Sequence, residues 1–482
     1  MPNLEPIRPS FHLEVLSSSQ LEAIRTATLD VLKTIGICFP SERALAVFAE
    51  HGADVDFQNQ IVKLPSDLVT QAMEQAPRSY TLGARHEDAD LFLDGEASYL
   101  ATDGCGVETL DFDTRERRPS RKDDVAKMAC VADFLTSVSF YWPMVSAQDY
   151  GRTAPLHELD ASFNSTLKHV QTETVMGRKP AEYAVRMGEV LADSREAMRE
   201  RPPFSVLICT IAPLAQDKEG IEAGMVYAEA GIPVGFMAMP NMGSTAPATP
   251  GGALVIGNAE VVSAMVLMQL VAPGAPVFHS ILASVMDPHT AEYIVSIPQK
   301  YLCNAAAVQL AHDWGVPTLA GAFGMDAKEP GTYKQGRDNA YTSLLVPLAG
   351  ADLITGSGLL EASTLLVPEQ IILDDEVYHT NRVLLEGIDT AAKSLALDVI
   401  FDVGPKGHFL AQDHTRRHLR DIWIPELTHP RPAGVGPSDG GMHQRAQAKL
   451  TRILADHQPE ALPGAAREEL QAILVAAAEE LA

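Results

Sequence analysis

Acidic side chains recur where apolar runs of this chain end. The residues at or beside these ends that could do chemistry are Asp103, Glu173, His279 and Glu361, together with Trp142, Gln148, Asp149 and Asp326. Carboxylates serve acid–base chemistry or bind a cation, and histidine accepts a proton near neutral pH. Each also fits a structural role, such as a turn for Asp103, an ion pair for Glu173 or a hydrogen-bonded core position for His279. If the runs are strands of one barrel, several of these groups meet at one mouth.

A polar loop rich in glycine and proline, PNMGSTAPATP, separates two apolar runs at residues 240–250. Its polar groups and backbone donors belong to Asn241, Gly243, Ser244 and Thr245. Thr249 followed by Pro250 predicts the N-cap and first turn of a helix. A tight turn with a helix cap explains the loop as well as a binding role does.

The elements that must position these groups follow a regular rhythm from about residue 97. Eight apolar runs alternate with helical patterns, at 98–104, 139–149, 168–174, 204–214, 232–241, 275–285, 316–324 and 352–361. Strands that alternate with helices imply parallel pairing through crossovers, and eight of them favour a (β/α)8 TIM barrel. A doubly wound sheet is the alternative, but no GxGxxG follows the first run. In a barrel, the active site lies at the carboxyl ends of the strands.

The flanking segments predict how the chain is organised. We expect a helical N-terminal region packed on the barrel (1–96), the catalytic barrel (97–362), helices that complete the barrel domain (363–429), and a linker with an acidic helical tail (430–482). The segment VETLDFDTRERRPS (107–120) predicts a β-hairpin insertion, and residues 288–314 predict one long helix. The tail is expected to pack on the barrel or on a second subunit.

Composition excludes several classes of protein. The chain has 482 residues and a formal charge of −26, which disfavours nucleic acid and anionic membranes as partners. Five scattered cysteines without a CxxC pair predict neither disulfides nor a standard zinc site. His414 and His418 share a helical face but lack a third ligand at a recognisable spacing. We find no signal peptide and no apolar run long enough for a membrane span, so we expect a cytoplasmic protein.

Several stretches resemble the trimethylamine methyltransferase family. They include SFNSTLKHVQTET (162–174), PNMGSTAPATPGGALVIGNAEVV (240–262), GTYKQGRDNAYTSLLVPLAG (331–350) and FLAQDHTRRHLRDIWIPEL (409–427), and the resemblance spans residues 10–430. It implies a (β/α)8 barrel that moves a methyl group from a tertiary or quaternary amine to the Co(I) of a corrinoid. The corrinoid is carried by a separate protein, so the resemblance implies no tightly bound cofactor and no metal in this chain.

The substrate implied by the resemblance depends on one residue type. Archaeal members insert pyrrolysine in a region similar to residues 323–335, where this chain has only ordinary residues. Members without pyrrolysine act on quaternary amines such as glycine betaine, proline betaine or carnitine. We therefore expect a glycine betaine-like substrate, and a trimethylamine-specific enzyme is the alternative.

The resemblance also suggests roles for the candidate residues. A quaternary ammonium is best held by aromatic faces and carboxylates. The substrate-binding candidates are Tyr141, Trp142, Phe323, Tyr333 and Asn241, beside Asp103, Glu173, His279 and Glu361 as catalytic candidates. A betaine carboxylate would need a donor, for which Asn241, His279, Lys328 and Arg337 are candidates. The corrinoid is expected to approach the backbone at Gly243, Ser244, Thr245, Gly356 and Ser357. For Phe236 and Phe278 a core position is the simpler interpretation.

Other functions compete with this interpretation. A barrel demethylase or lyase with another acceptor would need a convergent metal-ligand set or a different cofactor. A betaine-binding protein without catalysis is a further alternative. The expected partners are a corrinoid protein and a small quaternary amine, and the size and tail are compatible with a homo-oligomer.

Overall fold

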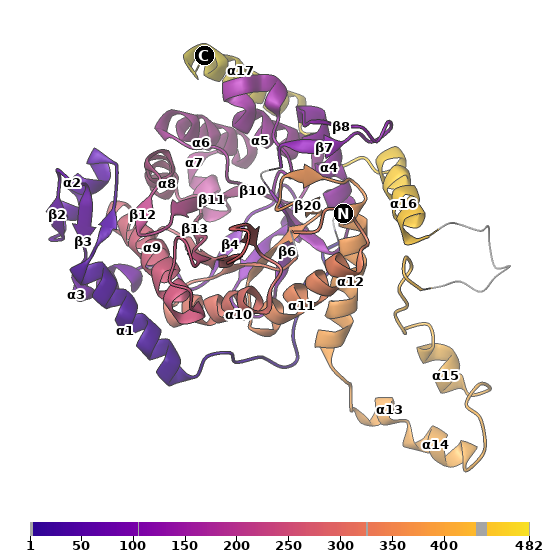
Figure 1. Cartoon of the computed structure of the whole chain (residues 1–482). Coiled ribbons are helices and arrows are strands. Elements are labelled where there is room, and N and C mark those ends of the chain that lie inside the picture. The colour runs from indigo at the N-terminus through magenta and orange to yellow at the C-terminus, as the bar shows by residue number, and fades with distance from the viewer. Residues whose placement is uncertain (1–2, 105, 324–325, 430–440, 482) are drawn as a thin grey trace.

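Eight parallel strands form a closed barrel in the computed structural model, which describes residues 3–104, 106–323, 326–429 and 441–481. They are β6 (Tyr99–Thr102), β9 (Val138–Tyr141), β10 (His169–Thr172), β11 (Phe204–Ile211), β13 (Val234–Ala238), β15 (Val277–Ile281), β18 (Leu319–Gly321) and β19 (Leu353–Ser357). Neighbours in the chain are neighbours in the ring, and β19 pairs with β6. The backbone N–H of His279 donates to Pro317 at 2.9 Å and closes the ring between β15 and β18. The predicted (β/α)8 barrel is confirmed (Figure 1).

Helices surround the barrel and connect its strands. They are α4 (Lys122–Phe134), α5 (Ala154–Ser165), α6 (Arg178–Ala192), α7 (Arg195–Glu200), α8 (Lys218–Ala230), α9 (Pro250–Val271), α10 (Pro298–Asp313), α11 (Tyr333–Leu348) and α12 (Gln370–Glu386). Side-chain caps fix where several of them begin. The Asp217 side chain accepts from Gly220 N at 2.6 Å, and Thr249 accepts from Gly252 N at 3.4 Å. These caps satisfy backbone donors that have no partner within the helix.

The prediction of one helix over residues 288–314 is wrong for the first third of this range. Residues 284–294 form a hairpin, β16 (Ser284–Met286) and β17 (Tyr293–Ile294), and β16 also pairs with β14 (Asn241–Met242). The Asp287 carboxylate accepts from His289 N and Thr290 N, which fixes the turn. Pro298 then starts α10 because proline suits the first turn of a helix. The hairpin carries Tyr293 over the end of the barrel.

The expectation that no apolar run is long enough to span a membrane needs correction at helix α9. Among the described residues it is the one helix that meets the length and composition for a span. It is a core helix of the barrel, since 78% of its apolar window is buried inside the protein. Its one acidic residue, Glu260, accepts hydrogen bonds from Thr210 Oγ1 at 2.6 Å and Leu214 N at 2.8 Å. Burial raises the pKa of Glu260 to about 7.

The N-terminal region mixes helices with short strands. It contains α1 (Ser18–Thr34), α2 (Glu42–Glu50) and α3 (Ser66–Met73), with β1 (Ile37–Cys38), β2 (Asp54–Asp56) and β3 (Ile61–Lys63) between them. Strand β1 pairs with β12 (Ala215–Gln216), which ties this region to the barrel. A second hairpin, β4 (Tyr80–Leu82) and β5 (Leu91–Leu93), closes the amino end of the barrel, where Tyr80 Oη donates to Val277 O at 3.0 Å.

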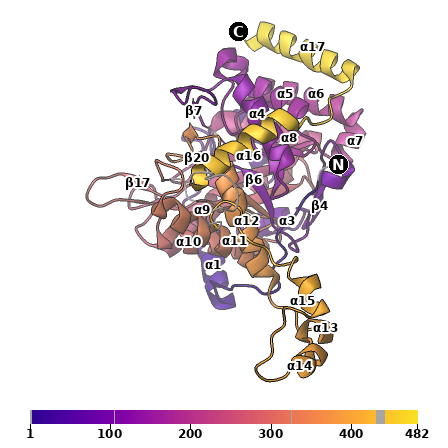
Figure 2. The same cartoon turned by 90° about the vertical axis from the view of Figure 1, so that its right-hand side faces the viewer.

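The opposite end of the barrel carries two insertions. The predicted hairpin at 107–120 is present as β7 (Glu108–Leu110) and β8 (Arg117–Pro119). It joins β20 (Leu359–Leu360) and β21 (Leu365–Leu366) in a small sheet of its own. This sheet and the β16–β17 hairpin rise on the same side of the barrel (Figure 2).

Beyond α12 the chain leaves the barrel and returns. The short helices α13 (Ala392–Leu395), α14 (Leu397–Val403) and α15 (Asp413–His418) lie away from the body (Figures 1 and 2). The predicted linker falls largely on residues 430–440, which lie outside the described residues. Helix α16 (Met442–Asp456) then packs on α4 and α12, and α17 (Gly464–Leu481) packs on α6 through Leu470, Ile473 and Leu474.

The inside of the barrel leaves no room for a side chain at Gly235. A Cβ there would lie 1.9 Å from the Phe278 ring, whereas a Cβ at Gly251 would meet nothing within 4 Å. We therefore expect Gly235→Ala to lower the free energy of unfolding by about 1–3 kcal/mol through overpacking. Urea unfolding followed by circular dichroism measures this, with Gly251→Ala as the matched control. Equal midpoints for the two variants would contradict the packing described here.

Candidate active site

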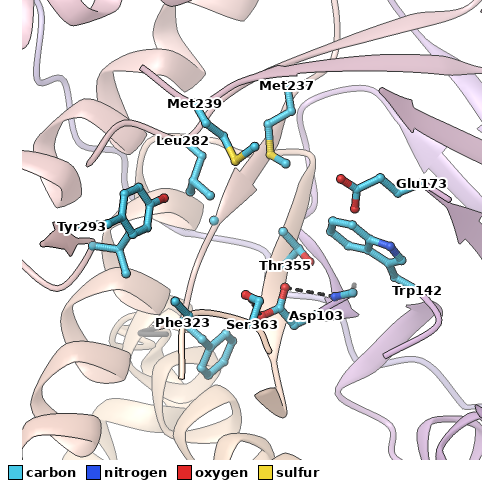
Figure 3. A pocket seen from close by; sticks show the side chains of 15 residues that line it. Asp103, Trp142, Glu173, Met237, Met239, Leu282, Tyr293, Phe323, Thr355 and Ser363 are labelled. Atoms are coloured by element: carbon cyan, nitrogen blue, oxygen red, sulfur yellow. Dashed lines mark hydrogen bonds between the residues drawn. The ribbon is translucent and has the colours of Figure 1, made fainter. Parts of the chain in front are cut away.

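A cavity of about 190 Å³ opens at the carboxyl ends of the barrel strands (Figure 3). Two carboxylates line it, Asp103 after β6 and Glu173 after β10, with three aromatic rings from Trp142, Tyr293 and Phe323. Apolar side chains complete much of the wall: Met237, Met239, Leu282 and Val295. Its volume lies below the range of sites for drug-sized molecules, so the cavity suits a small ligand.

Asp103 is a buried carboxylate held in one orientation. Ser363 Oγ donates to Asp103 Oδ2 at 2.6 Å, and the Gly104 N–H donates to Oδ1 at 3.0 Å. Burial raises the pKa of Asp103 to about 6, although both hydrogen bonds oppose that shift. The negative charge of Glu173 raises the pKa of Asp103 further, so the two carboxylates interact electrostatically across the cavity.

Glu173 lies on the wall next to a thiol. Cys209 Sγ on β11 donates to Glu173 Oε1 at 2.9 Å. Burial raises the pKa of the Cys209 thiol well above its usual range, and the Glu173 charge adds to the effect. Cys209 is therefore a neutral donor that holds a carboxylate, rather than a thiolate nucleophile.

The aromatic rings are held by close packing with glycines. A Cβ at Gly104 would lie 2.1 Å from the Trp142 indole, so the ring needs glycine at that position. Gly356 lines the cavity with φ +112, and a Cβ there would lie 3.2 Å from the Phe323 backbone. The Tyr293 ring comes from the β16–β17 hairpin, and its hydroxyl points into the cavity (Figure 3).

A left-handed turn places Ser363 against Asp103. Glu361, Ala362 and Ser363 have φ values of 53, 55 and 65, which non-glycine residues rarely adopt. Ala362 and Ser363 line the cavity as a result. Unfavourable backbone geometry of this kind is characteristic of functional sites, where the surrounding structure holds it in place.

Lys300 supplies a buried positive charge behind the cavity. It lies on α10, is fully buried, and its Nζ has no hydrogen-bond partner within the described part of the chain. Burial lowers the pKa of Lys300 to about 8, while Asp326, Asp103 and Asp338 act in the opposite direction. The interaction with Asp103 shows that this ammonium and the cavity share one electrostatic environment.

The structure brings five of the predicted site residues to the cavity wall: Asp103, Glu173, Trp142, Phe323 and Gly356. Strand alternation explains the placement of Trp142, since the next residue back, Tyr141, points outward and donates to Val125 O at 3.0 Å. Ser357 lies just behind the wall, where its hydroxyl contacts Asp374 at 3.4 Å.

Three other predicted residues lie apart from the wall. His279 is on the outer face of β15, where its ring contacts Asn258 Oδ1 at 3.0 Å, and burial lowers the pKa of His279 to about 3. Glu361 forms an ion pair with Arg117 at 3.1 Å. Tyr333 is at the start of α11 and is 84% exposed.

The polar loop after β13 lies at the rim rather than on the wall. Gly243 adopts φ +95 in a turn in which Ser244 N and Ala246 N both donate to Asn241 O at 3.0 Å. The Asn241 N–H donates to Thr245 Oγ1 at 3.0 Å. The candidate carboxylate donors also lie elsewhere: Lys328 is exposed, and Arg337 pairs with Asp338.

Sequence reasoning missed several wall residues. The sequence predicts a helix at Tyr293, and Ser363 lies beyond the last apolar run. Met237 and Leu282 belong to predicted strands, and their inward direction could have been read from the alternation of side chains. Lys300, which lies behind the wall rather than on it, could not be singled out from the sequence, because one lysine in a helix is normally solvated. Within the described ranges, no group of three or more His, Cys, Asp or Glu side chains is placed to hold a metal ion.

The two carboxylates and the indole predict that the cavity binds a small organic cation. We expect Asp103→Asn to weaken tetramethylammonium binding at least about tenfold, because the charge lies in a buried site where pairing is strong. Isothermal titration calorimetry measures the affinity. Glu361→Gln is the matched control, since this carboxylate pairs with Arg117 away from the wall, and it should change the affinity less than twofold. Equal losses in both variants would place the cation elsewhere.

The binding should also depend on pH. The pKa of Asp103 is raised to about 6, so its carboxylate is neutral at pH 5 and charged at pH 7. Cation affinity should therefore rise about tenfold between pH 5 and pH 7 and then level off. The pH profile of Asp103→Asn should be flat over this range. An affinity that falls with rising pH in the wild-type protein would exclude Asp103 as the cation-binding carboxylate.

Comparison with known proteins agrees with this barrel fold. The sequence profile of the family described as trimethylamine methyltransferase (MTTB) matches residues 3–481. The chain is 33% identical to a trimethylamine methyltransferase of Desulfitobacterium hafniense, over 96% of this chain and 94% of the relative. It is 29% identical to a glycine betaine methyltransferase of the same species, over 95% and 96%. The monomethylamine methyltransferase of Methanosarcina barkeri shares the fold, with a TM-score of 0.50 at 12% identity over 96% of this chain and 91% of that one. This chain belongs to the trimethylamine methyltransferase family, a family of enzymes.

Proposed function

We propose that this protein transfers a methyl group from a quaternary amine of the glycine betaine type to the Co(I) corrinoid of a separate protein. The observation that carries the proposal is the pair of carboxylates, Asp103 and Glu173, that face one small cavity beside the Trp142 ring. A permanently charged ammonium group matches such a cavity, because carboxylates and aromatic faces both attract it.

The cavity can favour methyl transfer without acid–base chemistry at nitrogen. A quaternary ammonium loses its methyl group to leave a neutral tertiary amine, which needs no proton. The protein must hold the N–CH₃ bond in line with the acceptor, and positioning of this kind supplies much of a rate enhancement. Met237, Met239 and Leu282 make the wall around the carboxylates apolar, which excludes water from the methyl group.

The carboxylate of a betaine needs a donor on the same wall. The Tyr293 hydroxyl points into the cavity from the β16–β17 hairpin. The buried Lys300 ammonium adds positive charge behind the wall and interacts with Asp103. We assign the carboxylate to the side of the cavity that Tyr293 and Lys300 define.

The methyl acceptor has to approach from the open end of the barrel. Met239 is 36% exposed at the cavity, and Gly356, which also lines it, has no side chain to block the approach. The rim loop with Gly243, Ser244 and Thr245 lies at the same end of the barrel, where its backbone could contact the acceptor. The corrinoid is a substrate here rather than a resident cofactor, and its contacts with these residues stay a prediction.

An amine without a carboxylate is the second candidate substrate. Among the described residues, the cavity wall carries two carboxylates and no Lys, Arg or His side chain. This charge balance suits trimethylamine in its protonated form or a quaternary amine with a neutral tail as well as a betaine. The relative at 33% identity is named for trimethylamine, and the one at 29% identity for glycine betaine.

Reaction with reduced cobalamin tests the proposal and names the substrate. The purified protein is mixed with Co(I) cobalamin or a reduced corrinoid protein, and amines are added one at a time while the Co(I) absorbance is followed. We expect loss of Co(I) and formation of methyl-Co(III) with glycine betaine, and none with trimethylamine. Asp103→Asn should lower the rate at least about tenfold, because it loses the charge that positions the cation. Glu361→Gln should keep the wild-type rate.

Other outcomes would overturn the proposal in different ways. Turnover of trimethylamine alone would replace the substrate but keep the reaction. Tight glycine betaine binding without methyl transfer to either acceptor would favour a binding protein. Demethylation of an amine without any change in Co(I) would point to a barrel demethylase with another acceptor.

A further inference from the structure

We propose that residues 388–424 form a dimerisation arm that packs against a second copy of this chain. The arm starts after α12, runs through α13, α14 and α15, and returns to the barrel. Both views show it projecting from the body (Figures 1 and 2). Its return is anchored where Leu427 N and Thr428 N donate to the Glu376 carboxylate.

The arm helices are too short to be stable without a partner. They contain four, seven and six residues, and none of these residues is buried. Isolated helices shorter than about 12–15 residues are marginal in water, and most helices in proteins are stabilised by tertiary packing. The side-chain hydrogen bonds of the described arm residues stay inside the arm, as in Gln412 to Asp402 and His418 to Asp421. The arm therefore needs a covering surface that its own body does not supply.

The apolar surface of the arm has the size of an interface. Ten large apolar side chains between residues 388 and 424 are exposed, including Ile388 at 91%, Leu410 at 82% and Phe401 at 79%. Since large side chains each present roughly 150–250 Å², they leave on the order of 1,000 Å² uncovered. A standard stable interface buries about 800 Å² per partner, and monomeric proteins rarely expose larger apolar patches.

The charge of the arm fits contact with another copy of an acidic protein. The whole chain has a formal charge of −26, and two such bodies repel each other. The arm carries five Asp residues against five Lys and Arg residues, so its formal charge is zero. Contact through the arm avoids the repulsion that contact between the acidic bodies would cause.

A receiving surface lies at the base of the arm. A groove of about 1,090 Å³ separates the returning segment 420–427 from α4 and α12. Phe134 and Val383 are exposed apolar side chains on its barrel side, and Ile422 and Ile424 are on the arm side. In a two-fold dimer each copy presents the same patch, so an arm placed in the partner's groove brings the partner's arm into its own groove.

The position of the arm favours a second copy over a partner that must reach the cavity. The cavity opens on the side of the β7–β8 and β16–β17 hairpins, whereas the arm projects below the barrel, nearer the β4–β5 side (Figure 2). The tail helix α17, the other amphipathic candidate for a subunit contact, is already covered by its own barrel. The arm is therefore free to hold two barrels together while both mouths stay open.

Light scattering after size-exclusion chromatography tests the arm directly. We expect the wild-type chain of 51.9 kDa to elute at twice that mass or an even multiple of it at micromolar concentration. The double variant Phe401→Glu with Leu410→Glu should elute as a monomer, with a dissociation constant raised at least about 100-fold by the loss of two apolar anchors. The matched control is Phe57→Glu, the same change at an exposed phenylalanine in the β2–β3 turn. It should keep the wild-type mass.

Two further measurements keep the test decisive. Unchanged circular dichroism and tetramethylammonium affinity show that the double variant is folded, since the substituted side chains lie far from the barrel core. Hydrogen exchange of residues 388–424 should be slow in the wild-type dimer and fast in the variant. A monomeric wild type, or a folded double variant with the wild-type mass, would overturn the proposal. Protection of the arm only after addition of a corrinoid protein would overturn it in favour of that partner.

Discussion

Closure of the barrel is the constraint on which the rest of this structure depends. An open sheet of eight parallel strands would leave two unpaired edges, and the site residues on its first and last strands would lie far apart. The backbone contact between His279 on β15 and Pro317 before β18 completes the ring. Pairing of the last strand, β19, with the first strand, β6, makes neighbours of residues separated by about 260 positions in the chain, as the 2.6 Å contact between Ser363 and Asp103 shows.

The cavity concentrates charge that the fold alone does not need. Burying a carboxylate is costly unless hydrogen bonds or opposite charges compensate for the loss of water. Asp103 has two hydrogen bonds, and burial still raises its pKa to about 6; Lys300 lies behind it with no hydrogen-bond partner among the described residues. Buried ionisable groups with shifted pKa values and incomplete pairing cluster at functional sites, because a ligand supplies the missing interactions. The barrel thus carries an electrostatic cost at its mouth, and the proposed cationic substrate would reduce the part of it that comes from Asp103.

The cavity and the exposed apolar arm lie in different parts of the molecule. Insertions on the carboxyl side, the β7–β8 and β16–β17 hairpins, build the rim around the cavity. On another side, the segment after α12 leaves the barrel and keeps its apolar side chains in solvent. The first arrangement surrounds the small cavity, and the second is the surface of the proposed dimerisation arm. Their separation lets each work without obstructing the other.

The sequence by itself determined the barrel, its eight strands, the hairpin insertion and the family. Apolar periodicity and local motifs are properties of consecutive residues, so they can be recognised without the tertiary structure. It also placed Asp103, Glu173, Trp142 and Phe323 near the ends of strands, since the ends of apolar runs mark the ends of strands, and the structure brings all four to the cavity wall. Only the tertiary structure decided which of two consecutive strand residues faces the cavity. Tyr141 and His279 lie on the outer faces of their strands, and a shift of one residue in a strand exchanges inside for outside. Tyr293 and Ser363 were found only in three dimensions, because a hairpin and a left-handed turn without a local signal bring them to the cavity. Lys300 lies in a helix that the sequence predicts, but only the tertiary structure shows that it is buried.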